Sequence, residues 1–320
     1  MDVKSFLNRI AQIAVILFGV SFFCFCLTFL SPGDPAMTML TNGGNRPSPE
    51  LLEAVREEMG LNRPFLIQYG SWLLGVVKGD LGRSLSSKQP VRQTLMEHLT
   101  ATALLAVASL AVMLVVSMPA GILAAVKRNS WTDYLIRVIS FMGISMPGFW
   151  VGLMLLYIFG LKFGWFPIAS TVMGPKTLIL PSLTLAISMS SKYVRQVRTA
   201  VLEELSQDYV LGARALGISE RVILWRQVIP NALLPLITLL GLSLGSLLGG
   251  TAVVEIVFSW PGLGKLAVES ISLRDYPMVQ GVVLWMALIY LGVNLIVDIS
   301  YTWIDPRLRK QRAAGLLTLK

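Results

Sequence analysis

Charged residues are scarce in this sequence. Only 14% of the 320 residues are charged and 54% are hydrophobic, whereas about a quarter of the residues in soluble domains carry charge. The chain has one histidine and two cysteines, Cys24 and Cys26, which lie in one apolar run. This set allows neither a disulfide framework nor a metal cluster, so we interpret both cysteines as packing residues. The composition excludes an ordinary soluble domain.

Catalytic and nucleotide-binding motifs are missing as well. Residues 241–245, GLSLG, match G-x-S-x-G, but they lie in an apolar run with no histidine to activate Ser243. Residues 262–265, GLGK, resemble part of a phosphate loop, but Ser259 and Leu266 replace its first glycine and its Ser/Thr. We therefore expect no catalytic residue, cofactor-binding residue or metal ligand in this chain, and an intramembrane enzyme is disfavoured.

Long uncharged windows take the place of such motifs. A bilayer is crossed by about 20 apolar residues in a helix. Five windows reach that length, and a sixth, between Lys176 and Lys192, is shorter and the weakest. The five lie between Arg9 and Asp34, His98 and Lys127, Arg137 and Lys162, Arg226 and Glu255, and Asp275 and Asp298. The sequence predicts an all-α integral membrane protein with six transmembrane helices. Bends are expected in the third at Pro147-Gly148 and in the second at Pro119-Ala120-Gly121.

The basic residues predict the orientation. They are concentrated in residues 1–9, 127–137, 192–226 and 307–320, which the positive-inside rule assigns to the cytoplasm. Both termini are then cytoplasmic, and the net charge of +9 reflects topology and anionic lipid rather than nucleic acid. We divide the chain into a first helix at 1–30, an outer cap at 31–98, a core at 99–305 and a cytoplasmic tail at 306–320.

Within the outer cap the pattern predicts one helix, starting at Ser48-Pro49 and ending at Gly60. In the fifth span Gly241, Gly245 and Gly249 recur every fourth residue, which puts them near one helix face. Such a face allows close helix approach in lipid. The sequence leaves two roles open for this face: packing within the chain and an interface with a partner subunit.

Residues 206–230 interrupt the apolar pattern with polar sequence that predicts a hairpin of two short helices. Residues 211–215 are helical in composition, and Gly217 supplies the stop. Ser219 can cap a second helix, which Pro230 is expected to close. The spans lack the buried ionisable groups of proton- or sodium-driven carriers. This lack favours a transporter with an external motor and disfavours the alternative, a self-contained secondary carrier or channel.

Residues 206–230, here named the coupling hairpin, resemble the coupling segment of binding-protein-dependent ABC importer permeases. That family's pattern is Glu-Ala-Ala, three residues, Gly, nine residues, then a hydrophobic residue, any residue and Leu-Pro. Here Ala213, Gly217 and Pro230 hold their places, while Leu211 and Gly212 depart from it. The departures are similar to the dipeptide/oligopeptide/nickel branch, in which Asp-Tyr-Val precedes Ala-Arg-Ala, as at residues 208–210 and 213–215 here.

The resemblance extends along nearly the whole chain, and the outer loop suggests the first of the branch's two permeases. Further matching motifs are GDPA at 33–36, GLNRP at 60–64, Gln68-Tyr69, DLG at 80–82, Ser145-Met146-Pro147, Phe149-Trp150, FSWPGLG at 258–264, RDYP at 274–277 and Asp305-Pro306-Arg307. The resemblance implies a type I importer-like permease fold in a bacterial or archaeal plasma membrane. It implies import of small peptides or of nickel as a chelate, and residues 174–208 look somewhat closer to nickel-type members.

The resemblance also implies partners and roles. The partners are a second homologous permease, two ABC ATPases that hold ATP and magnesium, an extracytoplasmic solute-binding protein and membrane lipid. Gly217 would allow a tight turn, while Gly212 and Ala213 would keep one face small for close approach to an ATPase. The residues implied in ATPase coupling are Asp208, Tyr209, Gly212, Ala213, Arg214, Ala215, Gly217 and Pro230.

Overall fold

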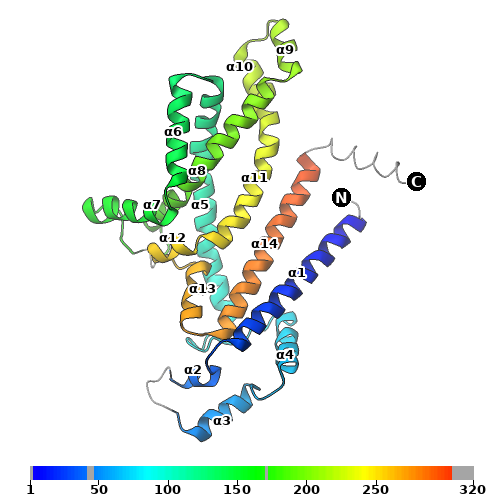
Figure 1. Cartoon of the computed structure of the whole chain (residues 1–320), viewed down its shortest axis with the longest axis vertical. Helices are drawn as coiled ribbons and strands as arrows, with labels where there is room; N and C mark the ends of the chain where they lie inside the picture. The colour runs from blue at the N-terminus through cyan, green and yellow to red at the C-terminus, as the bar shows by residue number, and fades with distance from the viewer. Residues whose placement is uncertain (1–2, 42–46, 170–171, 305–320) are drawn as a thin grey trace. The chain divides into compact units, whose positions relative to one another are not determined.

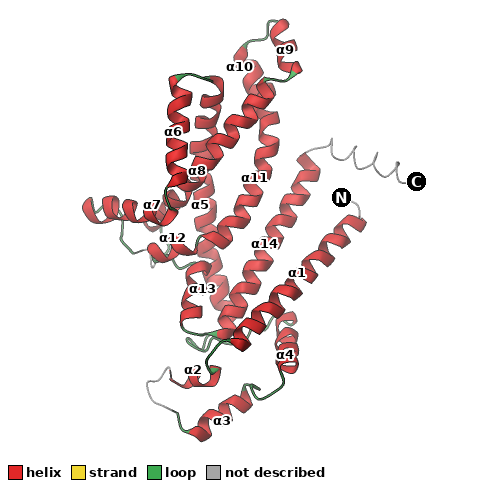
Figure 2. Cartoon of the chain, viewed as in Figure 1, coloured by secondary structure: helices red, strands yellow, loops and turns green. Residues whose placement is uncertain are grey.

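A computed structural model describes residues 3–41, 47–169 and 172–304, and the predicted cytoplasmic tail lies outside them. Within these ranges every regular element is a helix (Figures 1 and 2), and the one β-type pairing is an isolated bridge between Arg83 and Pro90. The elements are α1 (Val3–Leu30), α2 (Pro35–Thr41), α3 (Pro49–Glu58), α4 (Phe65–Val77), α5 (Val91–Val126), α6 (Trp131–Ser145), α7 (Gly148–Leu155), the π-helix η1 (Leu156–Lys162), α8 (Pro175–Leu205), α9 (Asp208–Ala215), α10 (Glu220–Ile223), the π-helix η2 (Leu224–Val228), α11 (Ile229–Gly250), α12 (Ala252–Val257), α13 (Leu263–Ser272) and α14 (Tyr276–Ile304).

Four helical stretches are long and apolar enough to cross a membrane: Leu7–Leu30, Val91–Val126, Glu220–Gly245 and Tyr276–Val297. They correspond to the predicted first, second, fifth and sixth spans. A fifth candidate is the pair α6 and α7–η1, which is bent by 99°. The predicted fourth span lies in α8, which does not meet this test among the described residues.

The bend in the third span falls where the sequence predicts it. Pro147 disfavours helical backbone at the residue before it, and Met146 is extended at φ −86° and ψ 129°. α6 therefore ends at Ser145, and Gly148 begins α7. Pro119, by contrast, lies inside α5, which continues through it as one helix.

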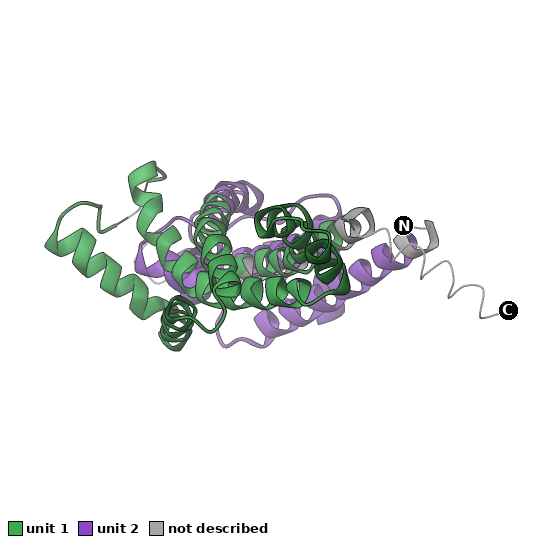
Figure 3. Ribbon diagram, turned by 90° about the horizontal axis from the view of Figure 1, so that it is seen from above, with its two compact units in different colours: residues 1, 104–247, 292–320 green, residues 2–103, 248–291 purple. Residues whose placement is uncertain are grey.

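The chain divides into two compact units (Figure 3). Unit 1 contains residues 104–247 and the chain from 292 onward, and unit 2 contains residues 2–103 and 248–291. In unit 1, α6 and α7 pack on α8. α5 also approaches α8 closely, since a Cβ at Gly121 of α5 would lie 2.6 Å from the Cβ of Val197 in α8. Likewise a side chain at Gly241 would collide with Val297 of α14, so this member of the glycine face packs within the chain.

Unit 2 is held by two buried carboxylates. Glu255 accepts hydrogen bonds from the Thr102 hydroxyl (2.8 Å), the Thr251 hydroxyl (3.0 Å) and the Lys265 amide at the start of α13 (2.9 Å). A side chain at Gly262 would collide with this carboxylate, which explains a glycine in the FSWPGLG stretch. The stretch thus shapes the corner before α13 rather than a phosphate site.

Asp275 is the second buried carboxylate of unit 2. It accepts hydrogen bonds from the Ser84 hydroxyl and from the amides of Leu85 (3.1 Å) and Ser86 (3.2 Å). It also accepts one from the Met278 amide in the first turn of α14 (3.3 Å). The RDYP motif is therefore joined through one side chain to residues 84–86, which follow the DLG motif and lie about 190 residues earlier in the sequence.

The outer cap contains the predicted helix, α3, and two helices that the pattern missed, α2 and α4. α3 begins after Ser48, whose hydroxyl accepts from the Leu51 amide, and Gly60 follows it at φ +67°. Of the two unforeseen helices, α4 packs on α1. Its Tyr69 donates or accepts a 2.9 Å hydrogen bond with Ser21 of α1 and contacts Phe22 edge to face. The division into residues 31–98 and 99–305 stays a prediction.

Candidate functional site: the coupling hairpin

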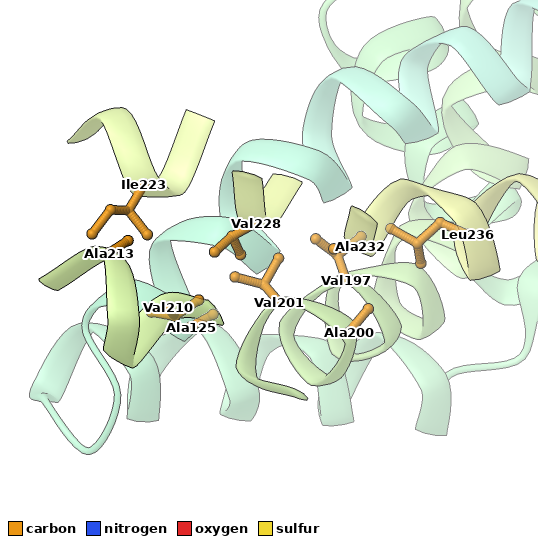
Figure 4. Close-up of a cluster of buried hydrophobic side chains, with 10 residues drawn as sticks. All are labelled: Ala125, Val197, Ala200, Val201, Val210, Ala213, Ile223, Val228, Ala232 and Leu236. Carbon is orange, nitrogen blue, oxygen red and sulfur yellow. The ribbon is translucent and has the colours of Figure 1, made fainter. Parts of the chain in front are cut away.

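The coupling hairpin projects from the end of α8 and is anchored by an apolar inner face. Val210 and Ala213 of α9, Ile223 of α10 and Val228 of η2 are buried. They pack in one cluster with side chains of α5, α8 and α11 (Figure 4): Ala125, Val197, Ala200, Val201, Ala232 and Leu236. This shared core attaches the hairpin to the helices that it connects, so the hairpin can move with them as a unit.

Gly217 ends α9 in a Schellman motif. Its amide donates to the Arg214 carbonyl at 3.0 Å, and the Ile218 amide donates to the Ala213 carbonyl at 3.1 Å. Gly217 has φ +74°, a conformation that glycine adopts at no steric cost. Ile218 then packs against the same cluster as Ala213, which is the hydrophobic contact typical of this motif. The predicted stop at Gly217 is confirmed.

An ion pair joins the two short helices of the hairpin. Arg214 of α9 donates from Nε and Nη2 to the two carboxylate oxygens of Glu220 in α10, at 2.7 and 3.2 Å. Hydrogen bonding to this carboxylate raises the pKa of Arg214 above its ordinary value. Both groups are exposed, so the pair sets the angle of the turn more than it stabilises the fold.

Tyr209 lies at the base of the hairpin. Its hydroxyl donates to Oε2 of Glu204 in α8 at 2.6 Å and accepts from Nδ2 of Asn231 in α11 at 3.5 Å. Partial burial and the Glu204 carboxylate raise its pKa. The tyrosine thus connects the helix that enters the hairpin to the helix that leaves it.

The outer face of the hairpin is exposed and partly apolar. Leu211 is 58% exposed and Leu216 is 81% exposed. Asp208, Gly212 and Ala215 lie exposed beside them. Isolated exposed leucines are ordinary, but Leu211 in α9 and Leu216 at its C-terminal cap leave apolar surface that a partner can cover.

Two expectations need correction. Gly212 is exposed with open space around it, whereas Ala213 is buried in the inner cluster, so these two residues do not form one small outer face. Pro230 does not close the second helix. The chain runs from α10 through η2 into α11, with Pro230 at the second position of α11, directly after the wider π turn of η2.

The structure brings the other predicted residues together on the hairpin, from Asp208 to Gly217. Val210, Ile223 and Val228 were missed as anchors, although apolar residues at these positions in a polar stretch are the signal that marks them. Gly245 is buried in α11, and the side-chain surroundings of Gly249 lie outside the described features. Within the described residues no group of histidine, cysteine or acidic side chains forms a metal site.

Comparison with protein families identifies the chain. Residues 117–310 match the family of binding-protein-dependent transport system inner membrane components, and residues 3–107 match the N-terminal part of such membrane components. The chain belongs to this family, and it is a multi-pass permease component of an ABC importer in the plasma membrane. Membership of this family excludes the alternative, a self-contained carrier or channel.

Individual relatives cover the chain almost completely. It is 35% identical over 330 residues to the dipeptide transport system permease protein DppB of Alkalihalophilus pseudofirmus, covering 95% of this chain and 98% of that protein. It is 37% identical over 303 residues to the glutathione transport system permease protein GsiC of Escherichia coli K12, with the same coverage.

The fold is also that of solved importers. One structure of the inward-facing MetNI methionine ABC transporter aligns with a TM-score of 0.56 at 21% identity, covering 67% of this chain and 97% of that one. An amino acid ABC transporter structure aligns with a TM-score of 0.51 at 16% identity, covering 66% and 94%. At these identities the likeness concerns the fold alone.

Proposed function

We propose that this chain forms half of the membrane pathway of an ATP-driven importer of small peptides. Its partners would be a second homologous permease, two ABC ATPases that hold ATP and magnesium, and an extracytoplasmic solute-binding protein. The relatives named for dipeptide and glutathione transport support a peptide cargo. Nickel, as a chelate, is the other cargo implied by the branch that the motifs resemble.

The observation that carries the proposal is the two-sided construction of the coupling hairpin. Its inner face is buried against α5, α8 and α11, while Leu211 and Leu216 remain exposed on its outer face. A short helix with one exposed apolar patch fits a groove on a soluble partner. Closure of the ATPases would then displace the hairpin as a rigid body, and α8 and α11 would follow.

Replacing Gly217 by arginine tests this coupling. A residue other than glycine at φ +74° costs about 1–2 kcal/mol, but no atom lies within 4 Å of the position where the Cβ would stand. We expect G217R to insert in the membrane in normal amounts, because the side chain points into open space. We expect it to abolish substrate-stimulated ATP hydrolysis of the reconstituted transporter, because the side chain would enter the ATPase groove.

Gly164 provides the matched control. It also has positive φ, +64°, with open space around its Cβ position, but it follows η1 and lies outside the hairpin. G164R should therefore insert normally and retain stimulated ATP hydrolysis. Coupled transport by G217R at the rate of the native transporter would overturn the assignment of the hairpin.

Reconstitution also separates the two cargo classes. Proteoliposomes that contain both permeases, both ATPases and the binding protein should accumulate a labelled dipeptide or tripeptide. They should do so only when ATP is supplied on the side of the membrane that carries the ATPases. Uptake of chelated nickel, with no uptake or competition by peptides, would assign the metal cargo instead. Uptake by this chain alone, without ATPases, would contradict the importer mechanism.

A further inference from the structure

A cavity of about 650 Å³ lies in unit 1 between α6, α8 and α11. It does not overlap the outer face of the coupling hairpin. Its lining is divided by chemistry. The cationic side is formed mainly by Arg137, Lys192 and Arg195, and the apolar side by Phe141, Leu236 and Leu239. We name it the basic pocket.

Part of the positive charge is neutralised inside the protein. Arg198, at the edge of the pocket, donates two hydrogen bonds to buried Asp133, at 2.7 and 2.8 Å. Arg137 lies 3.3 Å from the same carboxylate. One aspartate therefore faces two arginines, and it leaves an excess of positive charge on the α6 side of the pocket.

Arg195 and Lys192 have no such acid. No carboxylate of the described chain forms an ion pair with either residue, and the Nε of Arg195 is buried without a hydrogen-bond partner. The Arg195 guanidinium lies 5.2 Å from the centre of the Phe141 ring, a cation–π contact that holds it in place. The remaining acid of the lining, Glu203, is eight residues further along α8, about 12 Å from Arg195 along the helix axis.

The pocket lies at the depth of the lipid head groups. Arg137 begins the uncharged window of the third span, and Lys192 ends that of the predicted fourth span. Both cationic residues therefore mark the inner boundary of the hydrocarbon core. Leu236 and Leu239 of α11 belong to an apolar stretch that is long enough to span a bilayer, so the apolar side continues toward the core.

We propose that the basic pocket binds an anionic phospholipid of the inner leaflet, such as phosphatidylglycerol. The phosphate would accept hydrogen bonds from Arg195 and Lys192, and one acyl chain would lie along Leu236 and Leu239. Basic pockets between membrane helices on the cytoplasmic side suit such head groups. Inorganic phosphate shares the anionic chemistry, but it leaves the apolar side uncovered.

Native mass spectrometry of the full-length chain, released from nanodiscs of phosphatidylcholine and phosphatidylglycerol, tests the proposal. We expect the native chain to retain phosphatidylglycerol preferentially. The variant K192Q/R195Q should weaken this retention about fivefold per removed charge. The charge-conserving variant K192R/R195K should restore it and also report that the substituted helix still folds.

K127Q/R128Q is the matched control, because it removes two exposed cations just after α5 and outside the pocket. It should leave retention unchanged. Equal retention of both lipids by the native chain, or equal loss in both glutamine variants, would overturn the proposal. Displacement of the lipid by millimolar inorganic phosphate, with phosphate then bound, would also overturn it and assign the pocket to a free anion.

Discussion

At the scale of single residues, Asp133 of unit 1 is a fully buried carboxylate that depends on several donors. It accepts from Arg198, from the Asn129 amide at 3.0 Å and, with a longer ion-pair contact, faces Arg137. Asn129 has φ +62° just before α6. The carboxylate thus fixes both the turn between α5 and α6 and the packing of α6 on α8.

Replacing Arg198 should lower the stability of the protein more than replacing an exposed charged residue does. In R198A the carboxylate of Asp133 stays fully buried and loses its two strongest donors. We expect a loss of about 3 kcal/mol in the free energy of unfolding, measured as a fall in the thermal midpoint of the purified chain in detergent. R128A removes an exposed arginine and should change the midpoint by less than its experimental error.

The sequence could not single out Asp133, because its main partner is 65 residues away along the chain. The same limit applies to Glu255 and Asp275, whose donors come from distant segments. Gly217 is the opposite case. Its requirement is local, a left-handed residue at the end of a short helix, and it could therefore be predicted from a few neighbouring residues.

At the scale of elements, the outer face of α9 should determine binding of the ATPase. L211A/L216A removes the two exposed leucines and leaves the buried anchors Val210 and Ala213 in place. We expect the variant to insert normally but to lose co-purification with the ATPase subunits in detergent. L66A/V77A is the control, since it truncates two exposed apolar side chains of α4. Undiminished co-purification of L211A/L216A would show that the leucines do not carry the contact.

Local patterns predicted some elements and missed others for identifiable reasons. α3 has a serine cap, a proline at its first position and a glycine end, so its limits were predictable. α4 has no capping side chain and reads as an apolar stretch too short for a span. The π-helix η2 was not foreseen either, because Pro230 indicates a helix end unless the preceding turn widens to continue it.

At the scale of the whole molecule, the predicted orientation can be tested with single cysteines. Cys24 and Cys26 both lie inside the first span, so the native chain should react little with a membrane-impermeant maleimide. S219C in the hairpin should be labelled only from the cytoplasmic side, and E58C in α3 only from outside. Labelling of S219C in intact cells would contradict the orientation that the basic residues predict.

The number of spans depends on the whole fold as well. Four spans were predictable because apolar length is a local property. The third was predictable with its bend. The fourth belongs to α8, whose 31 residues include Lys192 and Arg195 of the basic pocket. Packing against α6 and α7 accommodates this polar helix within the fold.

The two carboxylates of unit 2 have a consequence for biosynthesis. Thr102 hydrogen-bonds to Glu255, which is synthesised 153 residues later, and Ser84 hydrogen-bonds to Asp275, which is synthesised 191 residues later. For Glu255 itself, the last partner to be synthesised is Lys265. Thr28 of α1 accepts from Gln280, 252 residues away. The early helices must therefore be inserted and remain without these partners until most of the chain has left the ribosome. A nascent chain stalled before residue 275 would be an unfinished protein, open to the quality-control proteases of the membrane.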